Sequence, residues 1–311
     1  MQQPACLPLA DCGFLSIQEV GTVAQQLGTF TQEGISVSPG LVVPVSLLKE
    51  IVLTNGVQEK LHTVLEQPED PQNFKRLRKM FSQLQLPPKV VEDFTYWYLH
   101  QGRAEGLVVL ESPVIRAQLE AGKPTLPVLD SPIEAIDTML ELWANSVNTF
   151  YQLRENLDEA LYSQSFIFMA SGRGALTATA YSMAIKDGSK KTIQIDTIKT
   201  GSTSPVQSFA VDIRTQEVLN APEKRQWLIT EKQLQTIATQ TQQLKRHFMS
   251  HIIAHWQLSS QGCEVLYLEE LSSNSPILSD RTLPSTKKYS QAFIVGKKVS
   301  PGMAQGSSVV L

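Results

Sequence analysis

The sequence has little of what marks several classes of protein. Its 311 residues carry a formal net charge of −3, so it lacks the excess of positive charge with which proteins attract nucleic acid or an anionic membrane. Its apolar runs are interrupted by Pro, Ser or Lys well short of the ~20 residues that a membrane-spanning helix needs. These absences predict a protein with neither nucleic acid nor membrane among its partners.

Cysteine is also scarce. Cys6, Cys12 and Cys263 are odd in number and lack the close paired spacing of a zinc site, which favours unpaired thiols in a reducing compartment over a disulfide framework. The N-terminus has no basic region ahead of an apolar stretch, as a secretory signal would have. We therefore expect a cytoplasmic protein.

The apolar residues that are present, 42% of the chain, predict helices over most of the first hundred residues and again after Pro132. Two short apolar runs, Gly106–Leu110 and Leu126–Leu129, predict strands between them. The other expected helices span Ser16–Leu27, Ser46–Leu53, Gln58–Leu65, Asn73–Leu84 and Val90–His100.

Beyond Phe166 the pattern changes to short apolar stretches separated by turns that contain Gly and Ser. It predicts an antiparallel sheet, with one further helix over Glu231–Phe248. The fold class expected is therefore α+β, with a mostly helical N-terminal part. The strands predicted are Ser165–Met169, Ala175–Ala180, Thr192–Thr197, Gln207–Ile213 and Cys263–Leu268.

Three histidines, His247, His251 and His255, recur every four residues. On one helix they would share a face and suggest a zinc site. If the helix ends near Phe248, the alternation that follows instead predicts a strand with His251 and His255 on its polar face. We favour the strand.

The chain after residue 271 has the composition of a linker, because residues 272–292 are rich in Ser, Thr, Pro and Lys. A turn at Ser300-Pro301-Gly302 then precedes a predicted strand over Ser307–Leu311. We expect three parts: a module over residues 1–271, a linker over 272–292, and the start of another domain over 293–311.

Several motifs, taken in order, resemble the nucleotide-binding module of the phosphoenolpyruvate synthase and pyruvate, phosphate dikinase family. The segment Gly34–Leu41 after a helix is similar to the family's GIPVPPGF, and Ser300–Gly306 is similar to the SPGxAxG that opens its swivelling phosphohistidine domain. The other matches are Val108–Ser112 with VRSSA, Ala121-Gly122 with AGQ, Trp143-Ala144 with WAS, Ser171–Ala178 with SGVxFTANP, Ser204–Asp212 with TPDTYVVD, and His247 to Trp256 with HFG to DIEW.

The resemblance implies an ATP-grasp-like fold of two subdomains that binds ATP with Mg²⁺ and passes a phosphoryl group through a phosphohistidine to pyruvate. Residues 1–271 would be the nucleotide-binding module and residues 293–311 the start of the phosphohistidine-type domain. It implies nucleotide contacts at Gly21, Ser112, Arg154, Thr177 and Glu269, and no catalytic residue. Arg154 would contact phosphate or ribose, or form a surface salt bridge, and Glu269 would bind Mg²⁺ or lie solvated at a strand end.

The chain departs from that family at positions where the family has charged residues that bind phosphate or metal. Val23 and Leu110 occupy the positions of a phosphate-binding Lys and Arg, while Ile253 and His255 occupy those of the DIEW carboxylates. Phosphoryl transfer depends on such cations and metal ligands. Two hypotheses follow: a kinase module with a degenerate site, which would work with a separate phosphohistidine or catalytic domain, or a non-catalytic pseudoenzyme or scaffold that keeps the fold.

Overall fold

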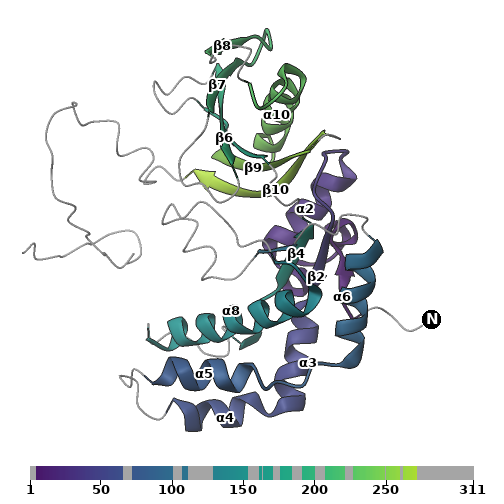
Figure 1. Cartoon of the computed structure of the whole chain (residues 1–311), viewed down its shortest axis with the longest axis vertical. Helices are drawn as coiled ribbons and strands as arrows, with labels where there is room; N and C mark the ends of the chain where they lie inside the picture. Colours follow the sequence, from purple (N-terminus) through teal and green to yellow (C-terminus); the bar gives the residue numbers. More distant parts are fainter. Residues whose placement is uncertain are drawn as a thin grey trace, which may run out of the picture.

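The structure, a computed structural model, consists of helices at one end and a large sheet at the other, with a smaller sheet between them (Figure 1). Predictions about Ser112, Arg154, the linker 272–292 and the segment 293–311 lie outside the described residues, as does most of the strand predicted at Leu126–Leu129. The structure describes residues 5–65, 72–100, 107–110, 129–152, 161–162, 164–170, 176–183, 191–199, 207–220, 227–248, 250–259 and 262–271.

The helical end confirms the predicted helices with small shifts of their bounds. Helix α6 begins at Pro88, where a proline costs no hydrogen bond because the first-turn N–H groups of a helix have no partner within it. Figure 1 shows α4, α5 and α8 lying alongside one another. The helices are α3 (Val45–Asn55), α4 (Val57–Val64), α5 (Asn73–Phe81), α6 (Pro88–His100) and α8 (Pro132–Gln152).

The first helix is interrupted where the sequence predicted it to be continuous. Helix α1 (Ile17–Val20) starts with a capping box, in which Glu19 accepts a hydrogen bond from the Ser16 backbone N–H at 3.1 Å. Gly21 then adopts φ +81°, and α2 (Thr22–Gln32) starts anew from it. Since an L residue rarely adopts that φ, glycine permits the break.

A 3-10 helix, η1 (Leu9–Phe14), packs on α2 at backbone distance. A Cβ atom added at Gly28 would lie 2.3 Å from the backbone nitrogen of Gly13 and 2.8 Å from the carbonyl oxygen of Leu9. The two segments therefore approach closely only because Gly13 and Gly28 have no side chains.

A four-stranded antiparallel sheet, in the order β1-β2-β4-β3, separates two hydrophobic cores. On β4, Phe166 and Phe168 face the helical core, and Ile167 and Met169 face the core shared with the larger sheet. The prediction that this strand belongs to the C-terminal sheet is wrong: its run of apolar residues reflects burial on both faces. The strands are β1 (Leu7–Pro8), β2 (Gly40–Val43), β3 (Leu107–Leu110) and β4 (Phe166–Ala170).

The larger sheet has six antiparallel strands in the order β10-β9-β5-β6-β7-β8. Strand β8 was not predicted; it is short and pairs only with β7 among the described strands. The strands are β5 (Leu176–Tyr181), β6 (Thr192–Lys199), β7 (Gln207–Asp212), β8 (Val218–Asn220), β9 (His251–Ser259) and β10 (Gly262–Leu271).

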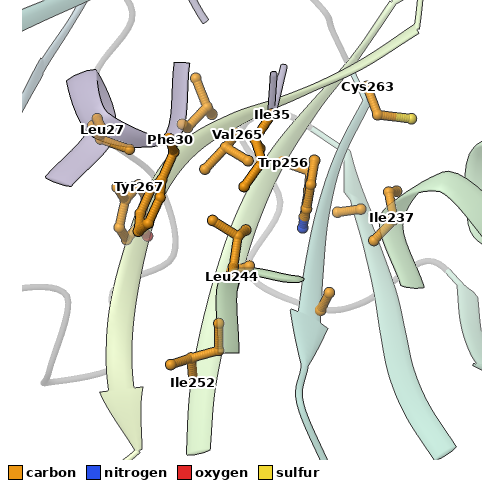
Figure 2. Close-up of a cluster of buried hydrophobic side chains, with 14 of the residues drawn as sticks. Leu27, Phe30, Ile35, Ile237, Leu244, Ile252, Trp256, Cys263, Val265 and Tyr267 are labelled. Atoms are coloured by element: carbon orange, nitrogen blue, oxygen red, sulfur yellow. The ribbon is translucent and has the colours of Figure 1, made fainter. Parts of the chain in front are cut away.

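Helix α10 (Glu231–Lys245) covers one face of the larger sheet, with apolar residues such as Ile237 and Leu244 turned toward Trp256 of β9 (Figure 2). Trp256 on β9 and Thr241 on α10 are both fully buried. Neither the Trp256 Nε1 nor the Thr241 Oγ1 has a hydrogen-bond partner among the described residues. The core between α10 and the sheet is thus apolar, although it encloses these unsatisfied polar atoms.

The segment before β2 joins the two sheets. The backbone N–H of Ser38 donates to the carbonyl of Val265 in β10 at 2.9 Å, and the Val265 N–H donates to the carbonyl of Ser36 at 2.8 Å. Toward the smaller sheet, the Ser38 hydroxyl donates to the carbonyl of Ala170 at 2.8 Å, and the Ala170 N–H donates to that of Pro39 at 2.9 Å. We call residues 36–39 the junction segment.

The predicted fold class is confirmed as α+β with two subdomains, a mostly helical N-terminal part and an antiparallel sheet with a helix in the C-terminal part. Within the described ranges, no helix is both long and apolar enough to cross a membrane.

Candidate ligand-binding face

The face of the larger sheet opposite α10 carries most of its polar side chains. Along β9, Ile252, Ala254, Trp256 and Leu258 lie in the core, so the alternate residues point the other way. This confirms the strand predicted after Phe248, with His251 and His255 on its second face. We call this second face, opposite α10, the polar face.

One row of polar residues crosses five strands of this face. From β10 to β7, the residues directly paired across neighbouring strands are Tyr267, His255, Thr179, Asp196 and Ser208. Cross-strand partners lie close enough for their side chains to interact. The register therefore brings together residues that are up to about ninety positions apart in the sequence.

The imidazole of His255 is held on three sides. Its Nε2 lies 3.0 Å from the Glu269 Oε1, its Nδ1 lies 3.3 Å from the Thr179 Oγ1, and its ring stacks on Tyr267 with 4.0 Å between centroids. Since an ionised carboxylate only accepts hydrogen bonds, Nε2 carries a proton. In the neutral imidazole, Nδ1 then accepts the hydrogen of the Thr179 hydroxyl.

Asp196 is the buried carboxylate of the row, with 7% exposure. It accepts hydrogen bonds from the Ser208 hydroxyl at 2.6 Å and from the Gln194 amide at 3.1 Å. Burial, and then Asp196 and Glu269, raise the pKa of Tyr181 above its ordinary range. The phenol of Tyr181 stays protonated and is a hydrogen-bond donor on this face.

Next to the row lies a small apolar cluster formed by Ile253 with Met183 and Tyr181. Ile253 is 4% exposed and is paired across the strands with Tyr181 on one side and Glu269 on the other. It holds the place where the family resemblance implies the first carboxylate of DIEW. An aliphatic side chain there cannot bind a metal or a phosphate.

On the other side of the row, Gln257 is paired with Thr177 and Glu264. Gln257 is 3% exposed, and its Oε1 has no hydrogen-bond partner in the described part of the chain. Glu264 lies 3.3 Å from the hydroxyl of Ser38, which belongs to the junction segment. This end of the polar face therefore adjoins the smaller sheet.

The charged side chains of the polar face are mainly carboxylates. Its described side chains on β5, β6, β7, β9 and β10 include Asp196, Glu264 and Glu269 but no Lys or Arg. Among the residues with described placement, no group of three or more His, Cys, Asp or Glu could hold a metal ion. His247 pairs with Glu33 at 2.8 Å, away from His255 and its partner Glu269.

The nucleotide contacts implied by the resemblance are only partly brought together. Thr177 and Glu269 both lie on the polar face, whereas Gly21 lies between α1 and α2. Val23, which replaces the expected Lys, packs partly buried against the core. The roles of these residues stay predictions. Asp196 was not predicted as a site residue, although the alternation of Ile193 and Ile195 with polar residues was a signal for it.

Comparisons with known proteins do not assign the chain to a family. No family and no curated protein matches it. Among solved structures, it is similar to D-alanyl-alanine synthetase A from Vibrio cholerae, with 11% identity and a TM-score of 0.34 over 85% of this chain and 64% of the other. An L-amino acid ligase from Bacillus licheniformis gives 11% identity and a TM-score of 0.28 over 68% and 51%. The chain spans less than two thirds of either protein, and such TM-scores carry no argument about activity.

Proposed function

We propose that the chain is a nucleotide-binding module of ATP-grasp-like type that has lost phosphoryl transfer, and that the polar face is its ligand-binding surface. The observation that carries this proposal is the pair of substitutions on β9. Ile253 is packed into an apolar cluster, and His255 is bound to Glu269. The resemblance implies a carboxylate at each of these two positions.

The chemistry of phosphoryl transfer supports the loss of turnover. Charge that spreads over the phosphate oxygens is stabilised by Lys, Arg and Mg²⁺. The described polar face offers carboxylates, hydroxyls and imidazoles instead, and its residues do not fit a resident metal ion. Mg²⁺ would therefore have to arrive with the nucleotide. Any transfer step would need a separate catalytic or phosphohistidine domain, and such a domain is the partner that we propose.

Isothermal titration calorimetry of the protein with ATP, in the presence and absence of Mg²⁺, tests the proposal. We expect binding that strengthens with Mg²⁺, because the metal offsets the repulsion between the triphosphate and Asp196 or Glu269. In the same samples, chromatography of the nucleotide should show unchanged ATP after hours. Formation of ADP or AMP would refute the loss of turnover. Absence of heat at millimolar ATP would refute nucleotide binding and favour the scaffold hypothesis.

A further inference from the structure

Gln257 is a buried polar residue on this face. It lies on β9 two residues beyond His255, so both side chains point to the same face. Its side chain is almost fully buried, with 3% exposure. Its Oε1 has no hydrogen-bond partner among the described residues. It is paired with Thr177 and Glu264, which flank it on the neighbouring strands.

A buried amide oxygen without a partner is costly, and native proteins rarely leave one. The flanking Glu264 does not supply the missing hydrogen, because an ionised carboxylate is an acceptor. The hydroxyl of Ser38 is already committed to the carbonyl of Ala170 at 2.8 Å. The group that satisfies Gln257 must therefore be a donor that comes from outside the described chain.

We propose that Gln257 is a specificity-determining residue, which accepts a hydrogen bond from an amino group of the ligand on the polar face. This inference rests on the proposed nucleotide-binding function and adds the class of nucleotide. A base with an exocyclic amino group, such as adenine, would satisfy the Gln257 Oε1. A base that lacks this amino group would leave the Gln257 Oε1 unpaired.

ATP and purine riboside triphosphate provide the test, because their bases differ only in an amino group replaced by hydrogen, with N1 an acceptor in both. Calorimetric titrations of the wild-type chain with each nucleotide and Mg²⁺ should show ATP binding about tenfold more tightly or better, the effect of one hydrogen bond gained against one buried acceptor left unpaired. In Gln257→Leu, ATP should weaken to the affinity of purine riboside triphosphate, and the two nucleotides should differ less than about twofold.

Gln240→Leu is the matched control. Gln240 also has a buried Oε1 without a partner, but it lies on α10, across the sheet from the polar face. This variant should keep the wild-type preference for ATP. Thermal unfolding of Gln257→Leu in the absence of nucleotide should occur no lower than for wild type, because the substitution removes an unsatisfied buried amide. That measurement separates a loss of recognition from a loss of folding.

The outcomes distinguish the inference from the function on which it rests. Equal affinity of wild type for both nucleotides would overturn the inference alone and indicate that a buried water satisfies Gln257. A preference for ATP that persists in Gln257→Leu would do the same. Absence of binding by either nucleotide at millimolar concentration would overturn the proposed function and the inference together.

Discussion

Introducing a carboxylate at Ile253, where the resemblance implies one, should destabilise the protein rather than create a metal site. Ile253 is 4% exposed and packs with Met183 and Tyr181, so Ile253→Asp removes a buried aliphatic group. That loss alone costs about 2–4 kcal/mol. The new carboxylate also lies directly across from Glu269, which adds the cost of burying a charge beside a like charge.

Together these terms give a loss of about 4 kcal/mol or more in the free energy of unfolding, a large part of the roughly 5–15 kcal/mol that holds a domain folded. The loss should grow as the pH rises above about 4. Burial and Glu269 raise the pKa of the introduced carboxyl in the folded state, so its penalty is smallest when both states are protonated and increases once the unfolded state ionises.

Urea denaturation at several pH values measures this effect. Ile253→Asn has nearly the shape of Asp without its charge, so it should lose packing energy but show no added dependence on pH. Ile253→Val should cost about 0.5–1.5 kcal/mol. An Ile253→Asp protein with wild-type stability that Mg²⁺ raises further would refute the argument, because the polar face would then be a metal site that lacks one ligand.

Three further predictions concern packing and burial elsewhere in the fold. Gly28→Ala should lower the free energy of unfolding by about 3 kcal/mol in urea titrations, because its Cβ would meet backbone atoms of η1; Gly34→Ala, at φ +81° in open space, should cost only about 1 kcal/mol. Burial raises the pKa of Cys12 and Cys263 to about 12, so iodoacetamide at pH 8 should alkylate both more than about 100-fold more slowly in the folded than in the unfolded chain, as mass spectrometry would show. Thr241→Val should leave the melting temperature unchanged or raise it, since it removes a buried hydroxyl without a partner.

Much of the fold follows from local pattern. The strand over β9 was predictable because Ile252, Ala254 and Trp256 alternate with polar residues, and this alternation also argued against a three-histidine metal site. Helix bounds followed from caps and prolines. The break at Gly21 was not predicted, because one glycine inside a helical pattern is compatible with either a continuous helix or an interruption.

The assignment of β4 to a sheet and the composition of the polar face could not be predicted from local pattern. A strand buried on both faces has no alternation that indicates its partner, so Phe166 and Ile167 give no signal of the two cores that they face. Likewise, Asp196 and His255 become neighbours of Thr179 only through the order of strands β9, β5 and β6. The order and register in which distant strands pair depend on the fold of the whole chain, so they cannot be read from each segment alone.

The hydrogen bonds of the junction segment restrict how the two sheets can move. Since Ser38 is bonded to both Val265 and Ala170, sliding one sheet along the other would break bonds on at least one side. A rotation about residues 36–39 would keep them. The junction segment therefore lies on the axis about which the two sheets could rotate. It is beside Glu264 and close to Gln257. A ligand on the polar face would lie near the axis of any closing motion, where displacements are smallest, so its binding should need little movement of the protein.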